Sequence, residues 1–106
     1  MPKDLKTVEY YDTYSALLTE RQREAMEMYY YSDLSLTEIA QETGVTRQAA
    51  FNTIKNSEIR LYELENAMKL IEKRKKLEKK LESLKPLLKN SKQGERLIEE
   101  IRELFN

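Results

Sequence analysis

The sequence contains no cysteine, histidine or tryptophan, and it has only two glycines and two prolines in 106 residues. Without cysteine it can form neither disulfides nor thiolate metal sites, and without histidine it also lacks the usual nucleophile–base pairs and most zinc ligands. Its glycines, Gly44 and Gly94, stand far apart, so there is no glycine-rich phosphate loop. We therefore expect a protein that is not an enzyme and that needs no metal or cofactor.

Long apolar runs are also missing. No stretch reaches the length of a signal-peptide core or a membrane-spanning helix. Charged residues make up 36% of the chain, and this abundance together with the scarcity of helix breakers favours solvated helices over sheets. The sequence thus predicts an all-α protein that does not insert into membranes and is located in the cytoplasm.

The formal net charge is zero, but its distribution along the chain is uneven. Residues 1–68 carry 7 basic and 12 acidic side chains, a net of −5. Residues 69–92 carry 10 basic and 3 acidic side chains, a net of +7, and residues 93–106 have a net of −2. A nucleic-acid interface is therefore to be sought in the strongly basic middle segment as well as in any DNA-binding motif.

Capping signals predict where the first helices begin. A first helix is expected over residues 4–17. Thr19 is followed three residues later by Gln22, and Ser35 is followed three residues later by Glu38, so each pair can form a capping box at the start of a helix. Two further helices are therefore expected after Thr19 and Ser35.

The second half of the chain is expected to be helical almost throughout. Thr46 is placed to cap a helix that nothing interrupts until well past Glu65. Two apolar stripes change phase at residues 73–76, so a helix either bends or ends there, or one long helix changes the face that it buries. Pro86 limits the next helix, and a last amphipathic helix is expected that carries Leu97, Ile98, Ile101, Leu104 and Phe105 on one face.

Residues 36–55 have the features of a helix-turn-helix. Ala40 is small where the first helix has to contact the second, and Gly44 can adopt the positive φ angle of the turn. Thr43 and Thr53 occupy positions where aliphatic residues are common. The apolar anchors on the two helices are Ile39, Val45, Ala50 and Ile54. The alternative is an ordinary helical hairpin closed by a glycine.

The second helix of this motif carries side chains that suit base recognition. Arg47, Gln48 and Asn52 lie near its amino end, where Arg pairs with guanine and Gln or Asn with adenine. Thr46 and Lys55 are candidate phosphate contacts. Because the motif contains as many acidic as basic residues, the alternative is a motif that serves as a scaffold or protein-binding surface.

The stretch LLTERQREAMEMYYYSDLSLTEIAQETGVTRQAAFNTIKNSE, residues 17–58, resembles the carboxy-terminal helix-turn-helix of bacterial sigma factors. It is more similar to the YlxM family of small bacterial proteins, and that resemblance extends more weakly over nearly the whole chain. The resemblance implies a helical bundle with a sigma-factor-like helix-turn-helix that has no wing, followed by a long helical carboxy-terminal extension.

Members of the YlxM family are regarded as DNA-binding regulatory proteins, so the resemblance implies a regulator of transcription. Their genes neighbour those of the signal recognition particle GTPase and its receptor, which implies a role in protein targeting with these GTPases as partners. Carried over by position, the recognition residues are again Arg47, Gln48 and Asn52. The alternative is a protein-interaction factor that modulates the GTPases and uses the helix-turn-helix as scaffold.

The basic segment offers a second nucleic-acid surface. Its side chains could bind phosphates of structured RNA or of double-stranded DNA, which makes RNA binding through residues 69–92 a third hypothesis. The alternative is a solvated helix face whose lysines pair with nearby glutamates. The phosphate contacts predicted in this segment are Lys73, Arg74, Lys75, Lys76, Lys79 and Lys80.

These patterns suggest two parts. Residues 1–66 form the helix-turn-helix domain, in which most of the clustered tyrosines are expected to belong to the core. Residues 67–106 form a basic, amphipathic helical extension that packs on the first part or on a second subunit. Because the apolar stripes over residues 61–88 exceed what one small domain needs, we expect a homodimer through these helices.

Overall fold

The computed structural model describes residues 3–105, which form six α-helices, two short 3-10 helices and no strand. In chain order the elements are α1 Leu5–Tyr14, η1 Ser15–Leu17, α2 Glu20–Tyr30, α3 Leu36–Thr43, α4 Arg47–Met68, α5 Leu70–Leu84, η2 Lys85–Leu88 and α6 Lys92–Glu103. The predicted all-α fold class is confirmed. No helix within residues 3–105 combines the length and the apolar character that crossing a membrane requires.

Both predicted capping boxes are present. The Thr19 hydroxyl accepts a hydrogen bond from the Gln22 backbone N–H at 3.1 Å, and the Gln22 side chain accepts one from the Thr19 N–H at 3.0 Å. Ser35 and Glu38 repeat this exchange at 3.1 and 3.0 Å. The hydrogen bonds from Ser35 hold the pKa of the Glu38 carboxyl below its usual range, so this group is ionised at neutral pH.

Two predicted helix ends are wrong. The first helix ends as an α-helix at Tyr14, and residues 15–17 tighten into η1. The interruption expected at residues 73–76 lies earlier, at Lys69, which has a left-handed conformation with φ 55°. The Lys69 carbonyl then accepts from the Lys73 N–H at 2.9 Å, so α5 runs without a break through the basic residues. Between Met68 and Lys69 the chain divides into two compact units.

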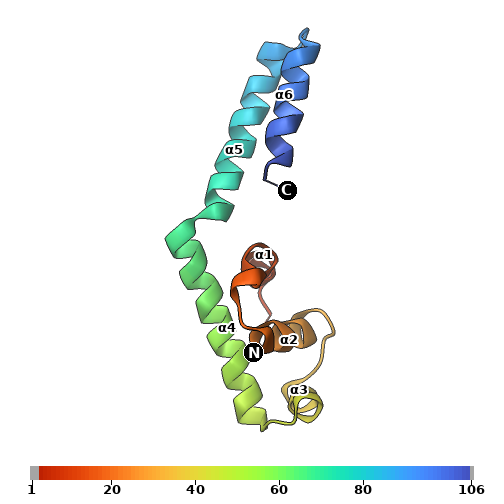
Figure 1. The fold of residues 1–106 in the computed structure, drawn as a ribbon, viewed down its shortest axis with the longest axis vertical. Coiled ribbons are helices and arrows are strands. Elements are labelled where there is room, and N and C mark those ends of the chain that lie inside the picture. The colour runs from red at the N-terminus through yellow and green to blue at the C-terminus, as the bar shows by residue number, and fades with distance from the viewer. Residues whose placement is uncertain (1–2, 106) are drawn as a thin grey trace. The chain divides into compact units, whose positions relative to one another are not determined.

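In the first unit, helices α1, α2 and α3 all pack along α4 (Figure 1). The buried face of α4 repeats every three or four residues, which is the spacing that aligns side chains on one side of a helix. Ser57 within this face is fully buried, and its hydroxyl donates to the Thr53 carbonyl at 2.6 Å. The largest buried apolar side chains of the unit are Tyr14, Met26, Ile39, Ile54 and Leu61.

Tyrosine hydroxyls join the helices of this unit by donating to carboxylates. Each bond connects residues of different helices or their ends, so side chains distant in sequence fix the packing. As expected, most of these rings are in or near the core, although Tyr31 is 52% exposed. The pairs are Tyr11 with Glu27 at 2.8 Å, Tyr14 with Glu65, Tyr30 with Glu58, and Tyr31 with Asp12.

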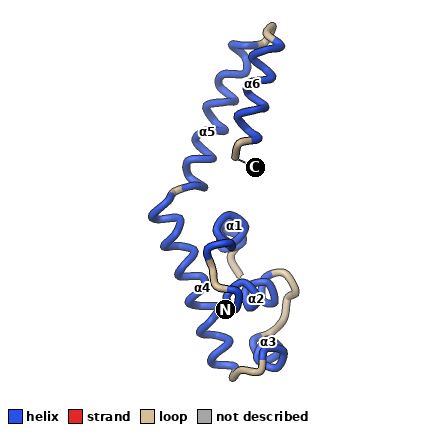
Figure 2. The backbone as a smooth tube through the Cα atoms, in the orientation of Figure 1, coloured by secondary structure: helices blue, strands red, loops and turns tan. Residues whose placement is uncertain are grey.

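The second unit is a hairpin in which α5 and α6 run antiparallel side by side (Figure 2). Ile71 and Leu81 of α5 and Ile98 of α6 are buried. Gly94 lies against Leu88, because a Cβ atom at Gly94 would be 2.9 Å from the Leu88 Cδ1 atom. A larger residue at this position would therefore have to displace the Leu88 side chain.

We expect the Tyr14→Phe substitution to lower the free energy of unfolding by about 2 kcal/mol, because a hydrogen bond to an ionised carboxylate is lost inside the first unit. Urea unfolding followed by circular dichroism measures the change. Tyr10→Phe is the control, since the Tyr10 hydroxyl makes no hydrogen bond within residues 3–105. Equal losses in the two variants would contradict the assigned role of the Tyr14 hydroxyl.

The tyrosine bonds also predict loss of stability at alkaline pH. Burial, reinforced by Glu27 and Glu58, raises the pKa values of Tyr11 and Tyr30, and burial with the Asp12 contact raises the pKa of Tyr31 to about 12. An unfolded tyrosine has a pKa of about 10, so this contribution is complete below that pH and is lost as the pH rises through the higher folded values.

Urea midpoints measured at increasing pH, together with an ultraviolet titration of tyrosinate, test this. The Tyr11→Phe/Tyr30→Phe variant should lose stability less steeply above pH about 10. Ionisation of every tyrosine at its ordinary pKa while the protein stays folded would show that the carboxylate contacts do not hold these protons.

Candidate nucleic-acid interface

The turn between α3 and α4 is closed by Gly44. Its φ angle is +69°, in the left-handed region that L-residues with a side chain rarely adopt. The N–H groups of Gly44 and Val45 both donate to the Ala40 carbonyl, the latter at 3.1 Å, which satisfies the free carbonyl at the end of α3. Ala40 itself is buried, as the predicted contact between the two helices requires.

The two threonines at positions where aliphatic residues are common have a structural explanation. The Thr43 hydroxyl donates to the Ile39 carbonyl at 2.7 Å, and the Thr53 hydroxyl donates to the Ala49 carbonyl at 3.0 Å. Each side chain thus satisfies its polar group within its own helix. Both residues are only half-buried, so threonine replaces an aliphatic residue here without leaving an unpaired hydroxyl.

Helix α4 begins at a capping residue and presents its polar side to solvent. The Thr46 hydroxyl accepts from the Ala49 N–H at 3.0 Å, and Ile54 anchors the helix in the core. Gln48, Asn52 and Lys55 follow at intervals of four and three residues, so they share the opposite, exposed face. The first turns of α4 are therefore held rigidly while their outer side chains remain accessible.

Two of the predicted base-reading residues form a pair. The Gln48 Nε2 group donates to the Asn52 Oδ1 atom at 3.0 Å, one helical turn away. This leaves the Gln48 Oε1 atom as an acceptor and the Asn52 Nδ2 group as a donor, which is the combination needed for the N6 and N7 groups of adenine. The sequence analysis missed this bond, although the four-residue spacing of Gln and Asn indicates it.

The exposed face at the start of α4 has little net positive charge around it. Arg47, at the first position of α4, is exposed, and Lys55 is the other cation of the motif. Glu38 and Glu42 of α3 oppose them, and Glu38 is ionised because of its capping role. The face therefore has groups suited to reading bases but few that neutralise phosphates.

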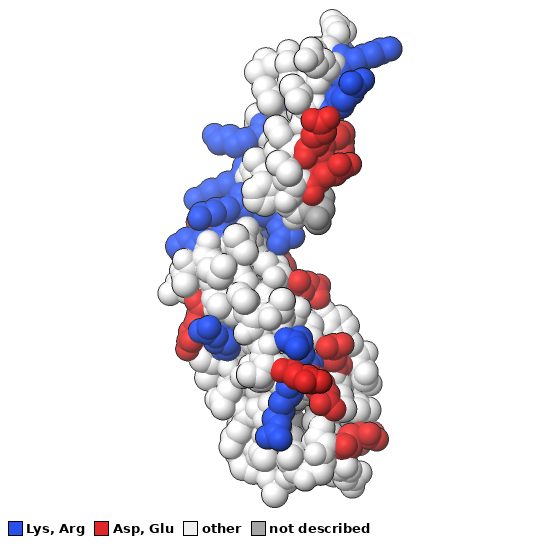
Figure 3. Space-filling model, in the orientation of Figure 1, with Lys and Arg blue, Asp and Glu red and all other residues white. Residues whose placement is uncertain are grey.

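The cations predicted to contact phosphate in the basic segment all lie on α5, in the second unit. Figure 3 shows Lys and Arg side chains of this unit along α5 and others at the end of the hairpin that joins α5 to α6. Glu72 offsets part of this charge, since its carboxylate lies 3.2 Å from the Lys76 ammonium and 3.7 Å from that of Lys69. Helix α5 still carries six basic against three acidic side chains.

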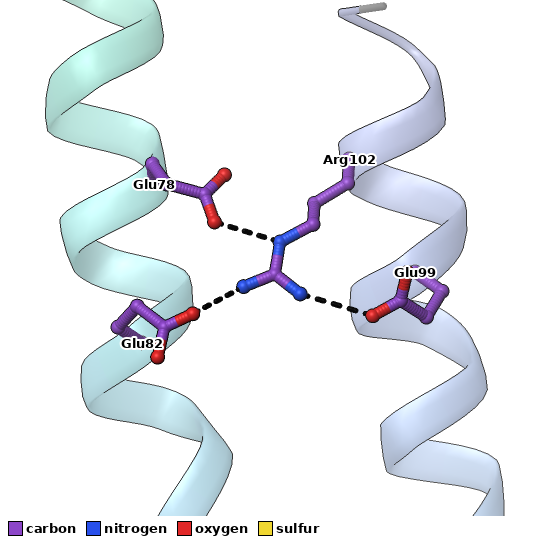
Figure 4. A network of polar contacts seen from close by, with 4 residues as sticks. All are labelled: Glu78, Glu82, Glu99 and Arg102. Atoms are coloured by element: carbon purple, nitrogen blue, oxygen red, sulfur yellow. Dashed lines mark hydrogen bonds and ion pairs between the residues drawn. The ribbon is translucent and has the colours of Figure 1, made fainter.

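The other two glutamates of α5 are bound by α6. The Arg102 guanidinium contacts Glu78 at 2.8 Å, Glu82, and Glu99 of its own helix at 2.9 Å (Figure 4). These carboxylates raise the pKa of Arg102 above its usual value. Arg102 thus contacts one carboxylate oxygen of Glu78 and one of Glu82, and it links α6 to α5 through them.

The predicted site residues thus fall into two groups. The side chains of Thr46, Arg47, Gln48, Asn52 and Lys55 come together at the amino end of α4 in the first unit. The basic side chains of α5 belong to the second unit and form a separate candidate surface. Within residues 3–105 there is no cluster of three or more acidic side chains arranged to hold a metal ion.

Comparison with known proteins identifies relatives over most of the chain. Residues 1–101 match the family described as "Putative helix-turn-helix protein, YlxM / p13 like". A UPF0122 protein of Halalkalibacterium halodurans is 39% identical over 98 residues, covering 92% of this chain and 90% of the relative. A UPF0122 protein of Geobacillus sp. is 41% identical over 95 residues, covering 89% of this chain and 86% of the relative. A UPF0122 protein of Bacillus mycoides is 44% identical over 78 residues, covering 74% of this chain and 71% of the relative.

We expect Gly44→Ala to lower the free energy of unfolding by about 1–2 kcal/mol, because alanine is strained at a positive φ. No atom lies within 4 Å of the added Cβ, so the effect arises from the backbone alone. Thermal unfolding measures it. Gly44→Asn is the matched control, since asparagine tolerates the left-handed region better. A Gly44→Ala variant as stable as the wild type would contradict a strained turn.

Proposed function

Because the chain belongs to the family of YlxM- and p13-like helix-turn-helix proteins, we propose that it binds double-stranded DNA through α4 and regulates transcription. The observation that carries the proposal is the accessible side-chain set at the start of α4, which the glycine turn and the core hold in place. The role is one of binding rather than catalysis, and the cytoplasm is its proposed location.

The chemistry of this face suits the major groove. With the amino end of α4 in the groove, the Arg47 guanidinium can donate to O6 and N7 of a guanine. The hydrogen-bonded pair of Gln48 and Asn52 offers one acceptor and one donor to an adenine. Thr46 and Lys55 border these residues and can contact the phosphates on either side of the bases.

The test is a selection of duplexes from a random library, followed by fluorescence anisotropy titrations of the enriched duplex at several salt concentrations. The Arg47→Ala/Gln48→Ala/Asn52→Ala variant should bind the enriched duplex at least ~10-fold more weakly, because each lost base contact contributes on the order of 1–3 kcal/mol. Its salt dependence should change little, since the lysine and threonine contacts to phosphate remain.

The matched control is Arg60→Ala/Asn66→Ala, which removes an arginine and an amide from exposed positions further along the same helix. This variant should bind like the wild type. If no duplex is enriched and none binds in a salt-dependent manner, or if the two variants behave alike, α4 does not read DNA.

A second candidate function is a protein-interaction factor that modulates the signal recognition particle GTPase and its receptor. The observation that favours it is the excess of acidic residues on α3 and α4, which carry three basic and five acidic side chains, because this excess limits phosphate neutralisation. Under this hypothesis the helix-turn-helix is a scaffold. Rates of GTP hydrolysis by the two GTPases that stay constant when the protein is added would exclude it.

A third candidate is the binding of structured RNA through residues 69–92, favoured by the excess positive charge of α5. Lys75→Glu/Lys76→Glu/Lys79→Glu should abolish binding of signal recognition particle RNA under this hypothesis. The same variant should leave the reading of the enriched DNA duplex by α4 largely unchanged. Loss of RNA binding alone would therefore separate this activity from DNA recognition.

A further inference from the structure

The hairpin of α5 and α6 exposes more large apolar side chains than it buries. Ile71, Leu81 and Ile98 are its buried apolar side chains within residues 69–105. Chains of fewer than about 40 residues rarely bury enough surface to be stable without an additional partner or cross-link. The exposed apolar side chains of this unit are Leu70, Leu84, Leu87, Leu97, Leu104 and Phe105.

Most of these leucines belong to regular stripes. On α5, Leu77 and Leu84 are seven residues apart, and Leu97 of α6 and Leu104, the residue that caps the end of α6 in a helical conformation, have the same spacing. The buried residues Leu81 of α5 and Ile98 of α6 face the seam between the two helices. At 100° per residue, Leu77 and Leu84 are rotated away from Leu81 in the same sense as Leu97 and Leu104 are rotated away from Ile98. Because the two helices are antiparallel, equal senses of rotation place both stripes on one face of the hairpin.

The register of the hairpin sets the leucines at matching heights. Arg102 of α6 contacts Glu78 and Glu82, which places it level with the middle of α5. Gly94 of α6 lies against Leu88, at the closed end of the hairpin. The three residue pairs in these contacts have numbers that add up to between 180 and 184, so residues of α5 and α6 whose numbers add up to about 182 lie at the same height.

This register brings Leu77 level with Leu104, and Leu84 level with Leu97. The face therefore carries two leucine layers, one made by Leu84 of α5 and Leu97 of α6, the other by Leu77 of α5 and Leu104 at the end of α6. Leu104 is 79% exposed, Leu97 51% and Leu84 38%, whereas Leu77 is half-buried, so most of the face is open to solvent within the second unit. Stacked leucine layers on antiparallel helices are what one half of a four-helix bundle presents.

We propose that this face, defined by Leu77, Leu84, Leu97 and Leu104, binds the same face of a second copy of the chain. Two hairpins then form an antiparallel four-helix bundle in which each leucine layer is completed by its counterpart. Such a contact is self-complementary, as a twofold dimer requires. The bundle would join two helix-turn-helix domains.

Charge at the edge of the face selects the arrangement. Lys80 of α5 and Glu100 of α6 are exposed, lie at the same height and flank the leucine face. Neither has an ion-pair partner in the part of the chain that the structure describes. A twofold axis parallel to the helices sets Lys80 against Glu100 of the second copy, whereas a perpendicular axis brings equal charges together. We therefore assign the parallel axis.

Within residues 3–68, the exposed large apolar side chains lie on α1, on η1, at the residue that follows α2 and on α4. The structure also restricts the dimer expected over residues 61–88, because Leu61 and Leu64 are buried in the core of the first unit. The stripe left for a partner is the one on α5, extended by α6.

Sedimentation equilibrium of the full chain tests the proposal. The wild type should dimerise, and Leu97→Glu/Leu104→Glu should raise the dissociation constant at least ~100-fold, because four buried leucines per dimer are lost. The control is Leu5→Glu/Leu17→Glu, which changes equally exposed leucines of the first unit and should leave the dimer intact. Circular dichroism shows that each variant remains helical.

Charge exchange tests the arrangement without touching the leucines. Lys80→Glu and Glu100→Lys should each weaken the dimer roughly threefold to tenfold, because the pair occurs twice, and the double exchange should restore it. Dissociation constants that both single exchanges leave unchanged would overturn the parallel axis in favour of α5 packing on α5, because each exchange then replaces one pair of equal charges by another.

A wild type that stays monomeric, or a dimer that the leucine variant leaves unchanged, would overturn the interface. If the chain is monomeric and the leucine variant lowers its unfolding midpoint, the face is covered by the chain's own first unit. All these measurements are made without nucleic acid. Failure of the interface is therefore distinguishable from failure of DNA binding.

Discussion

The burial of one face of α4 is the constraint on which the first unit depends. Ile54, Ser57 and Leu61 of this helix are fully buried, and α1, α2 and α3 all contact it. A helix fixed along one side must turn its other side outwards. The exposure of Gln48 and Asn52 is therefore a consequence of core packing, and α4 serves as both the central helix of the core and the candidate recognition helix.

Charge organises the second unit in a different way. Arg102 is a single cation among three carboxylates, and its side chain is only 17% exposed. By binding Glu78 and Glu82 it joins α5 to α6. One side chain thus fixes the register of the hairpin and leaves α5 with a positive outer surface. The register, in turn, aligns the leucines of the two helices.

The features that could be predicted from sequence are those in which neighbouring residues determine the outcome. The capping boxes at Thr19 and Ser35 and the turn at Gly44 depend on three or four consecutive residues, and each is present. The interruption at Lys69 could not be predicted, because a lysine in a left-handed conformation has no local signature and persists only where the surrounding structure requires it. The tyrosine–carboxylate pairs are equally non-local, since they join residues of different helices.

The proposed interface would also resolve the weakness of the candidate recognition surface. With Arg47 and Lys55 as its cations, one helix-turn-helix can contact bases but releases few counterions, so its affinity for DNA should be low. Joining two such domains makes the second binding event intramolecular, at an effective concentration far above that of the free protein. Affinity would then arise from linkage while each domain keeps its discrimination between bases. A nearly neutral recognition surface is thus compatible with specific binding when the chain acts as a dimer.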